Sequence, residues 1–411
     1  MFFQVDQVYR KLLTILHKLK IEIFMKVLIM PCGIGMGHAS RCVTIAKKLQ
    51  EEGVEVAFAS YGCGYEMIDS YHKYQTLKLP EIKFYGDKGI LDIKYTVKKS
   101  IDIPYIFLKS IYQESKIIKQ FKPDIIVADS HFSVPITAKV LSIPCIMIQN
   151  ELTLNFSELY PEEKKVEYLE TGLKKFIKDV CNLSKVIIVP DLQGSTEIPE
   201  KLEKKIVHTG PFLRDDNHNT KSKEDIKRKL GFNNSEKIVL VTVGGSDFGI
   251  ELLKLICYAS SKLECDRLIF VTGPGIKADF ICESDKIIKK KFLDNMMEWM
   301  KISDVIITLA GHTTIMEIIS LGIPNIIIPI DNHPEQLKNA INIKKYGISI
   351  VKELKNLDPN KISKDINRLL NDSEVIKQAE KVKEMFSQYH GTDDAVKIIM
   401  ENALDSKSLK K

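Results

Sequence analysis

The sequence predicts an α/β protein built from two doubly wound parallel sheets. Three observations predict it: nine short apolar runs of strand length, helical patterns between the runs, and one polar break near the middle of the chain. Near-continuous apolar runs are typical of parallel strands that are buried on both faces. Alternation of such strands with helices favours sheets that carry helices on both sides.

The apolar runs fall into two groups. The first group lies at 26–31, 54–60, 124–129, 143–149 and 185–190, and the second lies at 237–245, 267–273, 304–310 and 323–330. Between them the polar stretch DDNHNTKSKED has the composition of a domain boundary. We therefore expect a first Rossmann-like domain over 25–212, a second over 213–385, and a C-terminal helix with a basic tail over 386–411.

An N-terminal extension, residues 1–24, precedes the first strand. Its leucines and valines recur at helical spacing, with Arg10, Lys11 and Lys18 between them. Three interpretations remain open: an extra helix packed on the surface, a peripheral membrane anchor, or sequence upstream of a true start at Met25. The third is favoured, because MKVLIMP is a natural beginning for a first strand.

The composition excludes several functional classes. The 411 residues are 44% hydrophobic and 28% charged, and the net charge of +6 is modest for this length. There is no arginine-rich block or RNA-binding motif, so nucleic acid is not an expected partner. No apolar run approaches the ~20 residues of a membrane span. The eight cysteines form no C-x-x-C pair, which is typical of reduced thiols in a cytoplasmic enzyme.

Two glycine-rich strand ends in the second half predict a diphosphate site. The first contains Gly245 and Ser246; the second, Gly311 to Thr314, opens a helix. Ligands of open α/β sheets bind beyond the carboxyl ends of the strands. Helix N-termini at that edge present free N–H groups and a positive dipole end, which bind phosphates.

Polar side chains near these loops suit the rest of a nucleotide sugar. Glu317, three residues after Thr314, is placed to accept hydrogen bonds from a ribose diol. Alone it would be explained as well by a favourable contact with the helix dipole. Glu335, Gln336 and Asn339 suit sugar hydroxyls, although a solvated polar loop is the common explanation for an isolated glutamine.

The second half resembles a known family. The block FLDNMMEWMKISDVIITLAGHTTIMEIISLGIPNIIIPIDNHPEQLKNA is similar to the donor-binding half of GT-B glycosyltransferases. The nearest group contains the lipid II-forming N-acetylglucosaminyltransferase and the galactosyl-diacylglycerol synthases. GIGMGH, VGGS, the linker HTGPFLR and IQNE resemble further motifs of this group. The resemblance covers roughly residues 25–400 and implies a GT-B architecture, with two Rossmann-like domains facing a cleft.

The resemblance implies specific roles for residues of the donor site. The backbone at Phe292 and Leu293 would read the uracil edge, and Glu317 would hold the ribose. Diphosphate contacts would come from Arg214, Gly245, Ser246, Gly311, His312, Thr313 and Thr314. Gln336 and Asn339 would hold the donor sugar.

The chain departs from the family pattern at Pro211, in the linker, and at His312 and Thr313. Smaller or apolar residues occupy the last two positions in the bacterial enzyme, so the donor sugar is not determined by the resemblance.

In this architecture the glycine-rich loop of the first domain faces the cleft. Gly35 and Gly37 allow the backbone to approach an anionic acceptor or the donor diphosphate. His38 follows at the helix start, where it would be either the base that deprotonates the acceptor hydroxyl or a hydrogen-bond donor to a phosphate. Asp129, at the end of its strand, would orient His38, act as the base itself, or cap the helix near Ser133. His131 is a weaker candidate.

The expected function is inverting transfer of a hexosyl or N-acetylhexosaminyl group from a UDP-sugar to an acceptor hydroxyl. No D-x-D pair occurs in the sequence, so we expect neither a metal nor another cofactor. The basic amphipathic segments 102–121 and 164–180 suit a lipid-linked acceptor and the anionic inner face of the cell membrane, although packed helices with solvated lysines explain them as well. The alternatives are a nucleotide-sugar 2-epimerase of the same fold and a non-catalytic nucleotide-sugar-binding protein.

Overall fold

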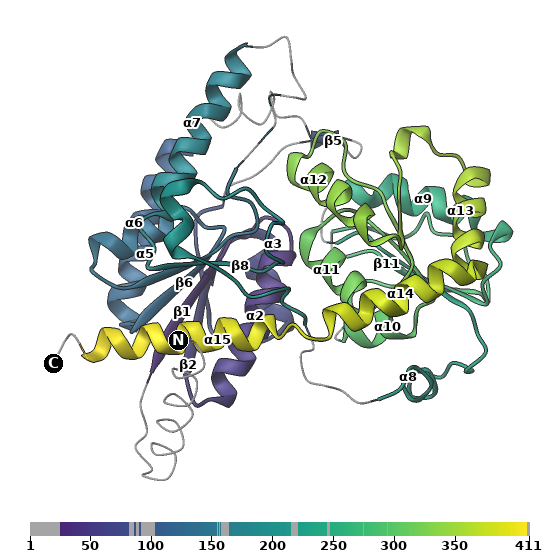
Figure 1. Ribbon diagram of the computed structural model, residues 1–411, viewed down its shortest axis with the longest axis horizontal. Helices are drawn as coiled ribbons and strands as arrows, with labels where there is room; N and C mark the ends of the chain where they lie inside the picture. The colour runs from purple at the N-terminus through teal and green to yellow at the C-terminus, as the bar shows by residue number, and fades with distance from the viewer. Residues whose placement is uncertain are drawn as a thin grey trace.

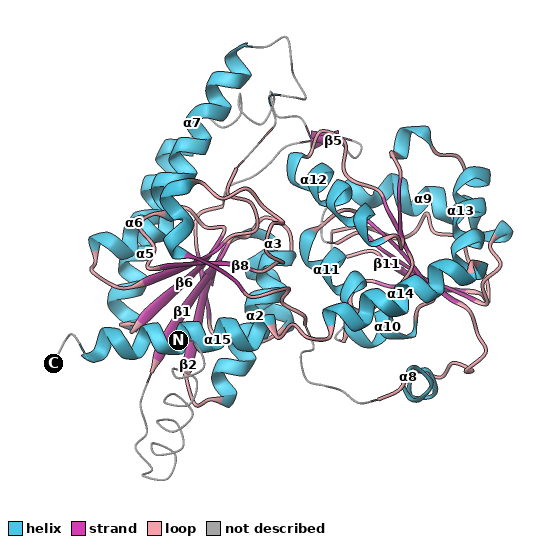
Figure 2. Cartoon of the chain, viewed as in Figure 1, coloured by secondary structure: helices cyan, strands magenta, loops and turns pink. Residues whose placement is uncertain are grey.

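The computed structural model describes residues 25–81, 86–87, 90–91, 103–153, 155, 157, 164–214, 221–244, 247–273, 275–293 and 295–408. Two parallel sheets form the two halves of the molecule, and helices cover both faces of each sheet (Figures 1 and 2). This is the predicted α/β architecture with two Rossmann-like domains. The proposed extension over residues 1–24 lies outside the described residues.

The first sheet has seven strands in the order β3-β2-β1-β6-β7-β8-β9, and every neighbouring pair is parallel. Its strands are β1 (Lys26–Pro31), β2 (Glu55–Ser60), β3 (Thr76–Lys78), β6 (Ile125–Asp129), β7 (Cys145–Ile148), β8 (Val186–Val189) and β9 (Ile206–His208). A separate antiparallel pair joins β4 (Gly86–Asp87) to β5 (Ile90–Leu91).

The second sheet has six parallel strands in the order β12-β11-β10-β13-β14-β15. They are β10 (Ile238–Thr242), β11 (Arg267–Val271), β12 (Ile287–Lys290), β13 (Val305–Thr308), β14 (Asn325–Ile327) and β15 (Ser349–Val351). This is the order of a doubly wound dinucleotide-binding sheet.

The sequence did not predict four short strands, β3, β9, β12 and β15. These four form the two edges of each sheet. An edge strand has a neighbour on one side only, and these are three or four residues long. They therefore lack the long apolar run by which a central strand is recognised.

Helices connect successive strands. Those of the first half are α2 (Gly37–Glu51), α3 (Gly62–Glu66), the π-helix η1 (Met67–Tyr71), α5 (Ile103–Phe121), α6 (Ser133–Val140), α7 (Lys164–Cys181) and the 3-10 helix η4 (Glu200–Lys205). Those of the second half are α8 (Lys223–Lys229), α9 (Ile250–Ala259), α10 (Met296–Ile302), α11 (His312–Ser320), α12 (Pro334–Ile343), α13 (Pro359–Asn371) and α14 (Ser373–Phe386), with 3-10 turns η5 (Asp247–Gly249), η6 (Ser260–Lys262), η7 (Lys344–Tyr346) and η8 (Leu354–Asn356).

The last helix, α15 (Gly391–Ser408), returns to the first half of the chain. Its apolar face, including Val396, Ile399 and Met400, belongs to the same buried cluster as β1 and α2. Figure 1 shows it lying across the first domain while α14 stays on the second. The chain therefore crosses between the domains twice, once near Pro211 and once near Gly391.

Two further observations concern the whole chain. Cys257 and Cys282 are joined by a disulfide with a Cα–Cα distance of 6.2 Å, so the expectation that all eight cysteines are reduced thiols is wrong for this pair. The expectation rested on sequence spacing, which does not reveal that α9 and the loop before β12 lie side by side. Among the described helices, none is long and apolar enough to cross a membrane.

Candidate active site

The two sheets place their loops at one shared site. In each sheet the chain first adds strands on one side of its first strand and then continues on the other side. The direction changes between β1 and β6 in the first sheet and between β10 and β13 in the second. Ligands of doubly wound sheets bind at the carboxyl ends of these strands. The loop after β1 leads into α2, and the loop after β13 leads into α11.

The glycine-rich loop after β1 requires small residues because the backbone is crowded. A Cβ atom on Gly33 would lie 1.8 Å from the carbonyl oxygen of Tyr61. Gly35 has a φ of 71°, and helix α2 begins at Gly37. The carbonyl of Gly37 accepts a hydrogen bond of 3.5 Å from the hydroxyl of Thr313 on α11. The N-terminal turns of α2 and α11 therefore meet across the domain boundary.

His38 lies in the first turn of α2 and contacts Asp129 at the end of β6. The distance from His38 Nδ1 to Asp129 Oδ1 is 2.8 Å, and the histidine side chain is 21% exposed. The structure thus brings together the two residues that the sequence singled out as candidates for the base, and only the histidine reaches solvent.

Asp129 is fully buried and surrounded by donors. Arg41 donates from Nε to Oδ2 at 2.5 Å and from Nη2 to Oδ1, and Cys42 Sγ lies 3.4 Å from Oδ2. Burial opposes ionisation, but Arg41 and His38 outweigh it and hold the pKa of Asp129 well below its usual range. The helix near Ser133 is capped by Phe132 without a side-chain hydrogen bond, so the capping alternative for Asp129 is wrong.

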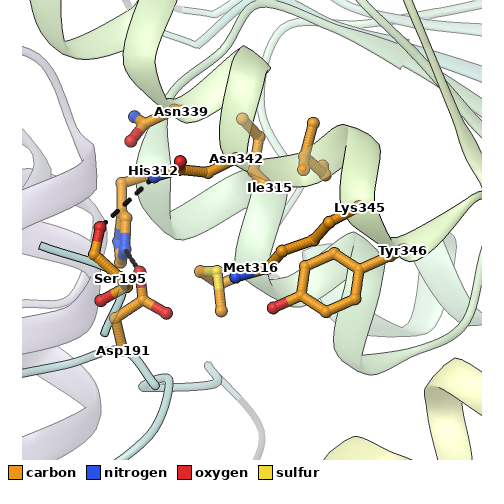
Figure 3. A pocket seen from close by; sticks show the side chains of 10 residues that line it. Asp191, Ser195, His312, Ile315, Met316, Asn339, Asn342, Lys345 and Tyr346 are labelled. Atoms are coloured by element: carbon orange, nitrogen blue, oxygen red, sulfur yellow. Dashed lines mark hydrogen bonds and ion pairs between the residues drawn. The ribbon is translucent and has the colours of Figure 1, made fainter. Parts of the chain in front are cut away.

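The start of α11 is linked to the first domain through His312. Its Nε2 atom lies 3.1 Å from Oδ2 of Asp191, which follows β8. Burial opposes ionisation of Asp191, but the hydrogen bond with His312 and its charge lower the pKa of this carboxyl. Figure 3 shows this contact in a pocket where Asn342 also donates to the backbone of Ser195, at 3.4 Å.

Arg214 and Glu317 are paired with each other. Arg214 donates from Nε to Oε1 at 2.6 Å and from Nη2 to Oε2 at 2.5 Å. The carboxylate is fully buried, whereas the arginine is 26% exposed. The resemblance implied separate contacts, to the ribose and to the diphosphate; here the two side chains engage each other.

Gln336 and Asn339 lie on α12 beside the loop that follows β13. The side-chain oxygen of Gln336 accepts from the backbone N–H groups of Ala310 and Ile330, at 3.2 and 3.0 Å. Asn339 Nδ2 donates to the carbonyl of Ala310 at 3.0 Å. Both residues therefore stabilise the backbone after β13, immediately before Gly311, His312 and Thr314.

Phe292 and Leu293 follow β12, at the carboxyl ends of the strands of the second sheet. Leu293 is buried in the core, whereas the ring of Phe292 stacks on Tyr71 of the first domain with 4.3 Å between centroids. Two predicted diphosphate residues, Gly245 and Ser246, lie outside the described residues.

Sequence reasoning missed Arg41 and Lys338 in this region. Arg41 contacts both His38 and Asp129, and its spacing of three from His38 on one helix was the available signal. Lys338 on α12 pairs with Glu151 after β7, with 2.7 Å between Nζ and Oε2. Glu335, which the sequence placed beside Gln336 and Asn339, is partly buried; burial opposes its ionisation, but the charges of His333 and, to a smaller extent, His38, His312 and Arg41 lower its pKa.

His131 lies apart from these groups. It is buried, its Nε2 atom lies 3.5 Å from Glu114, and its Nδ1 atom has no hydrogen-bond partner in the described part of the chain. Burial lowers the pKa of His131, with Glu114 opposing the shift. Among the described residues, no group of three or more histidine, cysteine, aspartate or glutamate side chains could hold a metal ion.

Comparisons with known proteins agree with this geometry. The family described as glycosyl transferase family 1 matches residues 25–243, and the glycosyltransferase family 28 C-terminal domain matches residues 238–396. An uncharacterized glycosyltransferase of Methanopyrus kandleri is 26% identical over 328 residues, which are 79% of this chain and 92% of the relative.

A second relative is the UDP-N-acetylglucosamine–N-acetylmuramyl-(pentapeptide) pyrophosphoryl-undecaprenol N-acetylglucosamine transferase of Lactobacillus helveticus. It is 24% identical over 395 residues, which cover 92% of this chain and 99% of the relative. Among solved structures, Acinetobacter baumannii MurG aligns with a TM-score of 0.59 and 18% identity, over 92% of this chain and 99% of that chain. The family match over more than half of the chain, together with the two-sheet fold, identifies the protein as a member of the GT-B glycosyltransferases.

Proposed function

We propose that the protein transfers a hexosyl or N-acetylhexosaminyl group from a UDP-sugar to an acceptor hydroxyl, with inversion at the anomeric carbon. The observation that carries the proposal is the meeting of α2 and α11: a partly exposed histidine from one domain stands beside the helix start that suits a diphosphate in the other. The acceptor oxygen bonds to the anomeric carbon, the bond from that carbon to the diphosphate breaks, and UDP leaves.

His38 is the base in this proposal. Asp129 is fully buried and its oxygens accept from Arg41, His38 and Cys42, so it has no route to an acceptor hydroxyl. His38 takes the hydroxyl proton at Nε2, the ring atom on the far side from Asp129. Asp129 orients the ring and stabilises the imidazolium that forms.

The leaving diphosphate is stabilised without a metal. Helices α2 and α11 meet at their N-terminal turns, and in the described part of the chain neither start has a side-chain cap. Such turns carry free N–H groups and a positive dipole end, which stabilise a phosphate. His312 is the first residue of α11. Arg214 lies near the following turns of this helix, because it contacts Glu317. Charge-assisted hydrogen bonds from these groups are about twice as strong as neutral ones.

Donor binding requires a change at the pair of Arg214 and Glu317. Both oxygens of the carboxylate face the guanidinium, so a ribose diol gains access to Glu317 only when Arg214 turns away. The exposed part of Arg214 then becomes available to the diphosphate. Glu335, beside Gln336 and Asn339, supplies a carboxylate to the sugar hydroxyls.

The acceptor in this proposal is carried by a lipid. Tyr105, Leu108 and Tyr112 are spaced along one face of α5 and are each at least 60% exposed. Lys109 lies between them and Lys116 one turn beyond Tyr112, over its ring, and both lysines are exposed too. Large apolar side chains among lysines suit an anionic membrane surface, and we place the enzyme at its cytoplasmic face.

The test is incubation of the full chain with labelled UDP-N-acetylglucosamine or UDP-hexoses and a lipid extract, with excess EDTA in a parallel sample. We expect a labelled lipid product and free UDP in both samples. A free 2-epimer would instead identify an epimerase, and binding without turnover would identify a non-catalytic binding protein. Loss of activity in EDTA that Mg²⁺ or Mn²⁺ restores would contradict the metal-free account.

A further inference from the structure

We propose that Arg41 is a positioning residue that sets the tautomer of His38 by keeping Asp129 ionised. The inference rests on the proposed function, in which His38 is the base. It assigns a role in the reaction to a residue that contacts neither substrate.

Arg41 is held at the junction of three elements. Its side chain is 2% exposed. It lies on the same face of α2 as His38, which precedes it by three residues. Besides its two hydrogen bonds to Asp129 at the end of β6, it donates from Nη1 to Asn150 Oδ1 at 2.5 Å, directly after β7. The planar guanidinium thus aligns α2 with two neighbouring strand ends.

The distances determine which nitrogen of His38 carries the hydrogen. Nδ1 lies 2.8 Å from Asp129 Oδ1 and 3.1 Å from Arg41 Nη2. The two contacts compete, because a carboxylate only accepts hydrogen bonds and a guanidinium only donates them, so a hydrogen on Nδ1 suits Asp129 and not Arg41. The contact with Asp129 is the shorter one, and Nη2 of Arg41 already donates to the same Oδ1 atom, so we assign the hydrogen to Nδ1. In the neutral ring Nε2 then bears the lone pair, as a base that faces the cleft requires.

This arrangement depends on the charge of Arg41. Without a nearby cation, a carboxyl as buried as Asp129 favours its neutral form. A protonated Asp129 could donate to Nδ1, and the hydrogen of the neutral ring would then move to Nε2. That tautomer cannot accept the proton of an acceptor hydroxyl. Arg41 therefore acts on the base through Asp129.

The charged groups that face His38 come from both domains. Asp129 and Arg41 contact it from β6 and α2, and Glu335 interacts with it electrostatically from α12. Of these three groups, Arg41 is the one whose charge keeps Asp129 ionised, so its removal should change the tautomer of His38.

The decisive measurement is nitrogen NMR of the full chain labelled with ¹⁵N-histidine, with the His38→Ala variant identifying the His38 signals. We expect the Nδ1–H form in the wild type and in Arg41→Lys, which keeps the charge, and the Nε2–H form in Arg41→Met. If Arg41→Met does not fold, Arg41→Met combined with Asp129→Leu removes both buried charges, and the Nε2–H form is again expected. An Nδ1–H form in the methionine variants, or an Nε2–H form in Arg41→Lys, would overturn the proposal.

Turnover provides the second measurement. Arg41→Met should lose much of the ~10²–10⁴ factor that general-base catalysis supplies, with UDP affinity within about twofold of the wild type. Arg267→Met is the matched control, because Arg267 pairs with Glu236 in the second domain, away from His38. Turnover equal to that of the control would contradict the role of Arg41. Full turnover of His38→Ala would instead contradict the proposed base, and the NMR comparison would still decide the tautomer.

Discussion

At the scale of single residues, the site depends on two buried carboxylates that are each paired with an arginine: Asp129 with Arg41 and Glu317 with Arg214. A buried carboxylate that loses its partner is strongly destabilising. Sequence position predicted His38, Asp129 and Glu317 as site residues, because strand ends and helix starts can be located from the pattern, and the family resemblance added Arg214. It did not predict these pairings, which depend on side-chain directions in three dimensions.

The first prediction concerns Asp129→Asn. The amide can donate to His38 Nδ1, which favours the wrong tautomer, and Arg41 is left without its charge partner. We expect turnover to fall by about 10⁴, as when the aspartate of a hydrolase triad is replaced by asparagine. We also expect unfolding free energy to fall by about 3–5 kcal/mol, measured by urea denaturation. Turnover within tenfold of the wild type would exclude Asp129 as the orienting group.

A comparison of the wild type with Asp129→Asn also shows how the stability that Asp129 contributes depends on pH. The folded-state pKa of Asp129 is lowered, so its contribution is fully present above the unfolded value of about 3.9 and is lost as the pH falls toward the folded value. The wild type should therefore exceed Asp129→Asn in melting temperature most at pH 7 and progressively less below about pH 4. The pKa values of Asp191 and Glu335 are also lowered, but both residues are present in both proteins, so their contributions to the difference cancel. A constant difference down to pH 3 would contradict the ionised state of Asp129.

Arg214 and Glu317 give the third prediction. Arg214→Ala leaves a fully buried carboxylate without its partner and should lower both stability and turnover. Glu317→Ala leaves a partly exposed arginine, so the cost to stability should be smaller, while UDP affinity falls by roughly 1.5–3 kcal/mol. Calorimetric titration with UDP and thermal unfolding of both variants separate the two effects. An unchanged dissociation constant in Glu317→Ala would remove it from the ribose site.

At the scale of elements, α12 supports the backbone that follows β13 and β14, and in the proposed function it also serves the donor site. It follows β14, and its Gln336 accepts hydrogen bonds from the ends of two strand segments. The sequence predicted the nine central strands of the two sheets, because central strands lie within long apolar runs. It missed the edge strands, and it placed Gln336 and Asn339 at the sugar without indicating that they also support the backbone of Ala310.

A pair of substitutions separates these two functions of Gln336. Gln336→Glu keeps an oxygen that accepts from Ala310 and Ile330 but removes the amide donor, so stability should be kept while donor-sugar affinity falls. Gln336→Leu leaves two backbone N–H groups without a partner and should cost about 1–3 kcal/mol for each. Thermal unfolding and binding of UDP against UDP-sugar distinguish the variants. Equal affinity of Gln336→Glu and wild type for the sugar nucleotide would argue that the residue is structural only.

At the scale of the whole molecule, the proposed chemistry depends on how closely α2 and α11 meet, because in that proposal one domain supplies the base and the other holds the donor. Side-chain contacts in the described part of the chain join the domains near this point: Thr313 with Gly37, His312 with Asp191, Asn342 with Ser195, Lys338 with Glu151, and Phe292 with Tyr71. The two crossings of the chain also touch each other. The sequence predicted the boundary near Pro211 from its polar composition, but nothing in the pattern indicated that α15 returns to pack beside α2.

Gly391, the first residue of α15, lies at this double crossing. A Cβ atom there would stand 2.4 Å from the carbonyl oxygen of Pro211 and 2.5 Å from that of Gly210, so Gly391→Ala must push the two crossings apart. Overpacking of this kind costs about 1–3 kcal/mol. Because the shift changes how the domains meet but leaves the second sheet intact, turnover should fall more than UDP affinity.

Gly172→Ala is the matched control: Gly172 lies in α7 with open space around its Cβ position, and alanine there should stabilise the helix by up to about 1 kcal/mol. The measurements are melting temperature, turnover and UDP affinity for both variants. If Gly391→Ala matched the control in all three, the contact between the crossings would have no part in setting the distance between base and donor.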